Sequence, residues 1–338
     1  MTRLRLCFLV LSLLASPARA ELHAFELDAP AAQAVYLAGE MTNWDQGKLP
    51  MSKGADGKWR LSVDLEAGQW VYKFVVDGQW IADPGTTDHD VDGRGGQHSF
   101  VFIGKGAWEE GPGVAKGRID TPMVPSKAWG HPMKVNMYLP PGFTRGKSYP
   151  VLWLLHGRGM DADQWLRTGK VNRYMDNLIA QGSIRPFVIV MPSSAELPYV
   201  GQSEQFITQE LPVWLHQTFG VHADRKRSAI AGMSMGGTGA FRLPLRRPDL
   251  YGFSFSLSGY FGDDIIAALP DRGLPMQSVL ICGSEDELVA TNRTLVAALT
   301  TRHAQFSYRE DAGGHTWQYW SHRVVEMLTA TNAFFTGK

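Results

Sequence analysis

Residues 228–243, SAIAGMSMGGTGAFRL, decide the fold because they place Ser234 where a strand passes into a helix. The run 227–231 predicts a short buried strand, and residues 237–243 predict the start of a helix. The small residues that flank the serine permit the tight, unusual backbone turn that connects the strand to the helix. The stretch therefore predicts a serine hydroxyl held out at the edge of a sheet as an attacking group. Pro244 predicts a kink or an early end of the helix.

Segments with strand and helix patterns alternate on both sides of this stretch. Continuous apolar runs, typical of strands covered on both faces, occupy residues 151–155, 187–191, 228–231, 253–257 and 279–282. Helical patterns occupy residues 171–179, 206–219 and 288–300, and a strand or hairpin region at 124–139 precedes them all. This alternation predicts an α/β fold with a mostly parallel sheet covered by helices on both faces.

Two loops that follow predicted strands contain possible partners for Ser234. Residues 283–287, GSEDE, follow one strand, and His315 closes the loop that follows the strand-like residues 306–310. The carboxyl ends of parallel strands meet at one edge of a sheet, so these loops and the serine should lie together. The chain order serine, acid, histidine is the order of α/β-hydrolases.

His315 is the predicted base, because two glycines precede it and let its loop bring the ring toward the serine. His303 and His322 lie in helical patterns and are expected at the surface. The acid that orients the imidazole is Asp286 in our interpretation, although the residues alone barely separate it from Glu285 and Glu287.

An oxyanion that develops on the substrate needs two backbone N–H donors. Met235, directly after the serine at the amino terminus of a helix, is one predicted donor. The loop at residues 155–159 follows the first central strand, and its Arg158 amide is the other. His156 in the same loop is expected to be buried and structural.

Composition limits the classes of partner. The chain has 338 residues, enough for two domains, and 44% of them are hydrophobic, as a globular core requires. Its 33 basic and 33 acidic residues give zero net charge, which provides no global field toward nucleic acid or an anionic membrane. Small neutral partners or a polysaccharide ester are expected, with no cofactor and no metal.

The first 20 residues have the pattern of a secretory signal peptide. Arg3 and Arg5 precede an apolar run at 6–14, and small residues around Ala20 offer a cleavage site. We expect an exported, periplasmic or secreted protein that starts near Glu21, with no membrane span. Removal of Cys7 would leave Cys282 alone in the mature chain and so exclude an internal disulfide.

Residues 21–104 predict a separate domain of short alternating strands, a small immunoglobulin-like β-sandwich. The predicted strands occupy residues 34–37, 58–63, 70–76 and 99–103, and Asp77-Gly78 predicts a hairpin turn. Residues 105–121 are rich in glycine without periodicity and predict a linker, so the catalytic domain should comprise residues 122–338.

Residues 88–93, DHDVDG, begin like a calcium loop. The twelfth position, where a bidentate glutamate should close such a site, is Ser99, and no helical pattern flanks it. The sequence therefore favours a solvated acidic turn over a metal site.

The front domain resembles the glycogen-binding, family-48 carbohydrate-binding modules. The resemblance rests on residues 39–44 (GEMTNW), 68–80 (GQWVYKFVVDGQW) and 83–84 (DP). It implies a sugar platform made of Trp44, Lys73 and Trp80, whereas the asparagine of the family is replaced here by Gln97 or His98. Aromatic faces suit sugar C–H surfaces. Glycan binding and a purely structural spacer remain equal alternatives.

The second domain is similar to the esterase D family, which includes feruloyl and acetyl-xylan esterases, siderophore esterases and mycolyltransferases. The motifs that carry this resemblance are residues 150–157 (PVLWLLHG), 232–237 (GMSMGG), 247–250 (RPDL), 257–259 (LSG), 283–286 (GSED) and 313–315 (GGH). The resemblance implies a triad of Ser234, Asp286 and His315, with oxyanion amides from Arg158 and Met235.

The sequence constrains the substrate less than it constrains the catalytic residues. Trp165, Tyr260 and Trp317, together with Tyr199 and Trp320, could line an aromatic acyl pocket or could equally be core.

We expect a serine esterase that acts through an acyl-enzyme on carbohydrate-linked feruloyl or acetyl esters. The alternatives are a siderophore (trilactone) esterase, an acyltransferase to a sugar and a non-enzymatic glycan-binding protein. A siderophore esterase would need cations facing its anionic chelate, but the basic runs 225–227 and 246–247 lie at the wrong ends of their elements.

Overall fold

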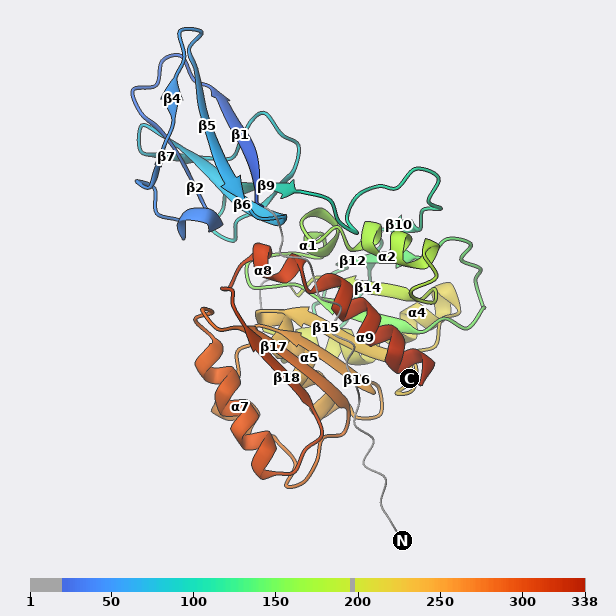
Figure 1. Ribbon diagram of the computed structural model, residues 1–338. Helices are drawn as coiled ribbons and strands as arrows, with labels where there is room; N and C mark the ends of the chain where they lie inside the picture. The colour runs from blue at the N-terminus through green and yellow to red at the C-terminus, as the bar shows by residue number, and fades with distance from the viewer. Residues whose placement is uncertain (1–19, 195–197, 338) are drawn as a thin grey trace.

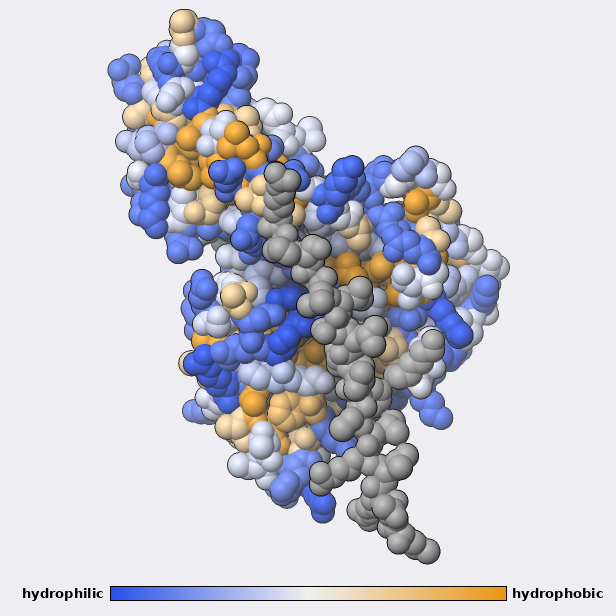
Figure 2. All heavy atoms as spheres, in the orientation of Figure 1, coloured by the Kyte–Doolittle hydropathy of each residue, from blue (hydrophilic) through white to orange (hydrophobic). Residues whose placement is uncertain are grey.

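The computed structural model describes residues 20–194 and 198–337. The predicted signal peptide, with Cys7, lies outside the described residues apart from Ala20. The chain forms two lobes, a small β-rich front module that stands out from a larger catalytic lobe (Figures 1 and 2).

The elements of the front module follow in chain order: β1 (Glu21–Asp28), β2 (Val35–Gly39), the 3₁₀-helix η1 (Glu40–Thr42), β3 (Leu49–Pro50), β4 (Ser52–Lys53), β5 (Lys58–Leu65), β6 (Gly68–Val76), β7 (Gln79–Ile81), β8 (His89–Val91) and β9 (Gln97–Ile103). The strands of the catalytic lobe are β10 (Arg118–Asp120), β11 (Met123–Val124), β12 (Met133–Leu139), β13 (Val151–Leu155), β14 (Val188–Pro192), β15 (Ser228–Met233), β16 (Phe253–Leu257), β17 (Gln277–Gly283) and β18 (Ser307–Asp311). Its helices are α1 (Gln164–Arg167), α2 (Val171–Ala180), α3 (Gln202–Gln205), the π-helix η2 (Phe206–Glu210), α4 (Leu211–Phe219), α5 (Met235–Arg246), α6 (Asp263–Ala267), α7 (Val289–Thr301), α8 (Trp317–Ser321) and α9 (Val324–Thr336).

The front module is a sandwich of two antiparallel sheets, as the alternating pattern predicted. One sheet has the order β1-β5-β4 and the other β3-β2-β6-β9-β8, with β7 paired to β6. Alternate side chains such as Phe25, Leu27, Leu37 and Phe74 form the core between them. Strand β1 escaped the sequence analysis, although Phe25 and Leu27 already alternate with polar residues there.

The predicted hairpin forms at the end of β6. Val75 pairs with Trp80 and Val76 with Gln79. Asp77 and Gly78 between them both have positive φ, 48° and 83°, which is the backbone that a two-residue turn requires.

The catalytic lobe contains one large, mostly parallel sheet. Its strand order is β10-β12-β14-β13-β15-β16-β17-β18, and β11 pairs with β12. The pairs from β14 through β18 are all parallel, whereas β12 runs antiparallel to β14 and β10. The carboxyl ends of the parallel strands therefore meet at one edge, on the side of the sheet that faces the front module (Figure 1).

Both faces of this sheet are covered by helices, which explains its continuous apolar runs. Within β13, Leu152 and Leu154 pack on the side that carries α2, α8 and α9. Val151, Trp153 and Leu155 pack on the opposite side, against η2, α4 and α5.

Pro244 does not end helix α5 early, which was one of the two outcomes that we predicted for it. The helix continues to Arg246. A proline at position 244 leaves the carbonyl of Ala240 without its helical N–H donor. The Ser254 hydroxyl donates to that carbonyl at 2.8 Å and replaces the missing hydrogen bond.

The predicted linker contains structured segments. Arg118–Asp120 forms strand β10 on the edge of the large sheet, paired with Leu139–Met137 of β12. Trp108 is buried and stacks on Phe102 of β9 with a centroid distance of 5.4 Å. These contacts give glycine-rich residues a fixed path between the lobes. Among the described residues, no helix combines the length and the apolar character needed to cross a membrane.

The acidic turn at residues 88–93 connects the two lobes. Asp88 binds Lys170 at 2.9 Å, and the buried Asp90 accepts a hydrogen bond from Thr168 and lies 3.2 Å from Arg167. These aspartates are bound to separate cations and a hydroxyl, so the turn serves as a contact between the lobes.

Candidate active site

Ser234 occupies the sharp turn between β15 and α5. Its backbone has φ 53° and ψ −124°, which is a strained conformation for a residue with a side chain. The flanking glycines are required sterically, because a Cβ on Gly232 would lie 2.5 Å from Gly236 and a Cβ on Gly236 would lie 2.3 Å from the Leu155 carbonyl. A hydrogen bond from the Ser234 amide to the Leu257 carbonyl, 2.8 Å, ties the turn to β16.

The structure brings Ser234, Asp286 and His315 together from three separate strand ends. The Nε2 atom of His315 lies 2.9 Å from the Oγ atom of Ser234. On the other side of the ring, Nδ1 lies 2.9 Å from Oδ2 and 3.1 Å from Oδ1 of Asp286. Trp320 packs edge-on against the imidazole at a centroid distance of 4.8 Å and limits its rotation.

Asp286 is buried, yet it is held ionised. Burial alone raises the pKa of its carboxyl, but the hydrogen bond and the charge of His315, the amide of Leu288 and the hydroxyl of Ser258 together bring that pKa below its usual value. An ionised acid at this position keeps Nδ1 of His315 protonated, so Nε2 is free to accept a proton.

Sequence reasoning gave Ser258 no role. Its side chain is fully buried at the end of β16, and its backbone has φ 48°. Its hydroxyl bonds to Asp286 and also accepts the indole N–H of Trp320 at 3.1 Å. The signal available in the sequence was the position of Ser258, directly after a buried strand at the same edge as Ser234.

The rival residues lie elsewhere. Glu285 and Glu287 are exposed on either side of the buried Asp286. His303 follows the end of α7, and His322 lies against Gly68 of the front module. His156 is buried, and its Nε2 atom accepts the Ser194 amide at 3.0 Å, which agrees with a structural role.

Of the two predicted oxyanion donors, Met235 directly follows Ser234 and Arg158 lines the same cavity as Ser234. Met235 is the first residue of α5, so its amide has no acceptor within its own helix. The Arg158 amide makes no hydrogen bond to any residue in the described part of the chain. The side chain of the buried Gln164 holds the loop by accepting the Gly157 amide at 2.9 Å, a support that sequence reasoning missed.

A cavity of about 790 Å³ opens over Ser234 and His315, and both lobes line it. The catalytic lobe contributes residues of the oxyanion loop, of α1 and of α8. The front module contributes the opposite wall. The residues of the front module that line the cavity are Glu40, Trp44, Val71, Lys73, Trp80, Asp92, Gly93, Arg94 and His98.

The predicted sugar platform thus lines the same cavity as Ser234 and His315. Trp44 and Trp80 are both 41% exposed, and their rings lie 6.3 Å apart. Lys73 also lines the cavity, but its ammonium group is paired with Asp92 at 2.5 Å, and both side chains are largely buried. The two indoles are therefore available to a sugar ring, whereas the ammonium group of Lys73 is occupied by its ion pair with Asp92.

The predicted aromatic acyl pocket divides into wall and core. Trp317 and its neighbour Trp320 line the cavity. Trp165 and Tyr199 are core residues instead, since they are almost fully buried and bond to the carbonyls of the strand β13 and its loop. Tyr260 is 52% exposed and is not part of the cavity wall.

Glu40 joins the front module to the loop that carries the histidine. Its carboxylate accepts the amides of Trp317 at 2.6 Å and Gln318 at 3.2 Å, in the first turn of α8. It also accepts the Val71 amide at 3.1 Å. Burial raises the pKa of Glu40 to about 7, although these three hydrogen bonds favour its charged form.

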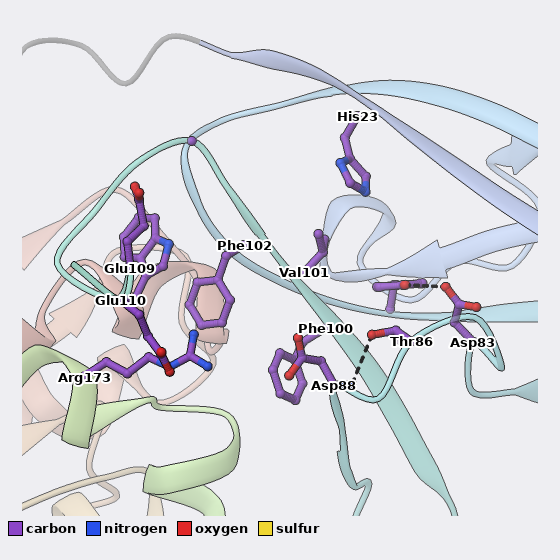
Figure 3. A pocket seen from close by; sticks show the side chains of 13 residues that line it. His23, Asp83, Thr86, Asp88, Phe100, Val101, Phe102, Glu109, Glu110 and Arg173 are labelled. Atoms are coloured by element: carbon purple, nitrogen blue, oxygen red, sulfur yellow. Dashed lines mark hydrogen bonds and ion pairs between the residues drawn. The ribbon is translucent and has the colours of Figure 1, made fainter. Parts of the chain in front are cut away.

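A second hollow of about 660 Å³ lies where β9 meets the linker (Figure 3). Its carboxylates are bound to neighbours: Asp83 accepts the Tyr72 hydroxyl at 2.6 Å, and Glu110 binds Lys116 at 2.6 Å. Its lining residues include neither Ser234 nor His315, so the triad cavity is the candidate active site.

Comparisons with known proteins agree with this architecture. Residues 126–264 match the family described as "Putative esterase", and residues 28–105 match the family described as "Glycogen recognition site of AMP-activated protein kinase". The endo-1,4-beta-xylanase/feruloyl esterase of Xylanibacter ruminicola is 28% identical over 290 residues, which are 81% of this chain and 39% of that protein. The chain thus spans about two fifths of the length of this curated relative.

Two solved structures are similar to the chain over different spans. A ferulic acid esterase is 26% identical with a TM-score of 0.57, covering 65% of this chain and 98% of its own. The enterobactin esterase of Shigella flexneri has a TM-score of 0.72 at 17% identity, covering 93% of this chain and 96% of its own, and so shares the fold of both lobes. The second lobe therefore matches an esterase family over residues 126–264, the front module matches a glycogen-recognition family over residues 28–105, and both lobes share their fold with a solved esterase.

Proposed function

We propose that this protein is a serine carboxylic-ester hydrolase that works through an acyl-enzyme. The observation that carries the proposal is the position of His315, whose two ring nitrogens each lie 2.9 Å from a partner, the hydroxyl of Ser234 and the carboxylate of Asp286. That geometry suits a base that takes the serine proton while a buried acid stabilises the charged ring.

In this mechanism the Ser234 oxygen attacks the ester carbonyl carbon as its proton passes to Nε2 of His315. The amides of Met235 and Arg158 stabilise the oxygen that becomes negative. Collapse of the tetrahedral intermediate breaks the ester bond, and His315 gives its proton to the departing alcohol. Water then attacks the acyl-enzyme with His315 as the base, which releases the carboxylic acid and restores the serine.

The proposed substrates are carbohydrate-linked esters of the feruloyl or acetyl type. Two of the three relatives described above are named for feruloyl ester hydrolysis, and one of these two also for xylanase activity. Trp44 and Trp80 supply aromatic faces in the same cavity as the triad, where they could stack on the sugar of the ester being cleaved. Stacking so close to the nucleophile would orient the sugar for the reaction.

The first test compares wild type with Ser234→Ala on p-nitrophenyl acetate. Turnover by wild type and its loss in the variant are expected, whereas equal rates would contradict the proposal and favour a glycan-binding protein without activity. A panel of feruloyl, acetyl and siderophore esters then identifies the acyl group. Product analysis with added sugar distinguishes hydrolysis from acyl transfer, because transfer leaves the acyl group on the sugar.

We also propose that residues 1–20 direct export and are removed, since the run at 6–14 follows two arginines and ends before small residues. Terminal sequencing of the protein recovered outside the cytoplasm should give a first residue near Glu21. Recovery of the protein with Met1 intact would contradict this.

A further inference from the structure

Some charged side chains in the wall of the cavity have hydrogen-bond or ion-pair partners, and others have none. Two carboxylates lie in its wall, and both are occupied. Asp92 binds Lys73 and accepts the amides of Arg94 and Gly96 at 2.8 and 2.9 Å. Glu40 accepts three amides that hold α8 and β6.

Apart from Glu40, whose pKa is about 7, and Arg94, the titratable groups of the front-module wall add no net charge. Lys73 and Asp92 cancel each other as an ion pair. His98 is neutral at neutral pH, because burial and the nearby Lys73 lower its pKa to about 4. His315 and Asp286 form the catalytic pair described above.

Two guanidinium groups in the same wall have no such partner. Arg94 comes from the front module and Arg158 from the oxyanion loop, and both residues are exposed. Within the described ranges, 20–194 and 198–337, neither side chain makes a hydrogen bond or an ion pair to another residue. Most arginines elsewhere on this surface are paired with aspartate or glutamate, for example Arg247 with Asp249 at 2.7 Å.

The backbone places these two arginines beside each other. Gly93 and Gly159, their immediate sequence neighbours, touch across the boundary between the lobes. A Cβ on Gly159 would lie only 2.8 Å from the Cα of Gly93, and a Cβ on Gly93 would lie 3.3 Å from the Cα of Gly159. Arg94 and Arg158 are therefore anchored on either side of one close backbone contact, next to the proposed oxyanion site.

We propose that Arg94 and Arg158 form an anion-binding subsite at the rim of the catalytic cavity, so that the preferred ester carries a carboxylate or a similar anionic group near its scissile bond. This rests on the proposed esterase function and narrows its substrate class. Guanidinium groups suit the purpose because each can bind a carboxylate through two parallel hydrogen bonds. The zero net charge of the chain, which favoured neutral partners, does not describe this local field.

The anionic group could belong to the alcohol, as in a uronic acid, or to the acyl part. Two series of esters distinguish these sources. The alcohol series is phenyl acetate with its meta-carboxylate and meta-trimethylammonium derivatives. The acyl series is phenyl hydrogen succinate against phenyl butyrate. Wild type should prefer the carboxylate over its uncharged or cationic counterpart in one series, and that series identifies the side.

The variants Arg94→Gln and Arg158→Gln test whether the arginines cause the preference. The readout is the ratio of kcat/KM for the anionic ester to kcat/KM for the uncharged ester in the same series. We expect each substitution to lower this ratio about fivefold, and added salt to lower it in wild type. Arg185→Gln is the matched control, because it removes an exposed arginine outside the cavity, and it should leave the ratio unchanged.

The outcomes separate the two proposals. No Ser234-dependent hydrolysis of any of these esters would overturn the esterase proposal itself. Ser234-dependent hydrolysis with no preference for the anion in either series, or with a preference that both arginine variants retain, would overturn the anion-binding subsite alone.

Discussion

The catalytic lobe and the front module line the same cavity, but their lining residues are positioned in different ways. In the catalytic lobe Ser234, Asp286 and His315 lie at the ends of buried parallel strands, where the register of the strands fixes them relative to one another. In the front module the lining residues come from η1 and the residues after it, from β6 and β7, and from β9 and the loop before it. The module contacts the other lobe through apolar packing of Val71 and Phe100 and through polar contacts such as Glu40 to α8.

This difference shows that the front module is more than a tether. A tethered binding module raises the local concentration of a polymer without touching the reacting bond. Here Trp44 and Trp80 line the cavity that contains Ser234, and Gly93 touches the loop of Arg158. The following predictions test the contribution of each lobe, beginning with the largest effect.

Ser234→Ala tests the catalytic lobe most directly. Without the nucleophile, kcat on p-nitrophenyl acetate should fall by about 10⁴-fold or more. The melting temperature should change little, because the substitution removes only the hydrogen bond of the hydroxyl with His315 and Ala keeps the backbone atoms of the turn. A residual rate close to that of wild type would mean that another group attacks the ester.

Ser258→Ala tests whether the support of Asp286 matters to the reaction. We expect kcat to fall by about 10-fold, because Asp286 loses a hydrogen bond and Trp320 loses its acceptor. The same loss raises the pKa of Asp286, so the acid limb of the kcat/KM profile should move to higher pH. Ser278→Ala, at another buried serine in the sheet, is the control and should leave the profile in place.

Trp80→Ala tests whether the front module contacts the substrate. For a glycan-linked feruloyl ester, KM should rise about fivefold through loss of stacking, whereas p-nitrophenyl acetate should be hydrolysed as before. The control is Ile81→Ala, the adjacent exposed residue of β7, which does not line the cavity. A rise in KM that is equal for both esters would refute a sugar-specific role of this wall.

Glu40→Gln tests the joint between the lobes and has the smallest expected effect. The carboxyl has a pKa of about 7 in the folded protein against 4.5 in an unfolded chain, so between these values the folded state binds the proton more tightly. Wild type should therefore lose stability relative to the variant as pH rises from about 4.5 to 7, by about 1 to 2 kcal/mol.

Urea unfolding of both proteins at several pH values measures this difference. The variant also loses a hydrogen-bond acceptor for α8, but that offset does not depend on pH. The exposed Glu66→Gln substitution is the control and should show no such slope. A difference between wild type and Glu40→Gln that is constant across the range would contradict the prediction.

Much of the fold could be predicted because local pattern and burial agree. The apolar runs at 151–155 and 253–257 became β13 and β16 with the same bounds, since strands covered on both faces need apolar residues at every position. The early helix end that Pro244 suggested does not occur, because the hydroxyl that replaces the missing hydrogen bond belongs to Ser254, on a neighbouring strand.

The residues of the site likewise divide into those that the sequence could predict and those that it could not. Ser234 and His315 lie in glycine-rich turns after strands, and glycine spacing is visible in a sequence. Ser258 is marked only by its place after a buried strand, and Gln164 carries no mark at all, because their roles depend on which groups lie beside them after folding. The aromatic residues could not be sorted either, since Trp165 and Trp317 differ only in which of them reaches the cavity.

By itself, the amino-acid order determined the two kinds of domain, the succession of strands and helices, and the turn that exposes Ser234, since these depend on periodicity and on residues close together in the chain. Only the tertiary structure decided that Trp44, Trp80 and Arg94 face the triad. Contacts such as that of Glu40 with Trp317 join residues that are far apart in the chain, and the sequence near either residue does not predict the contact.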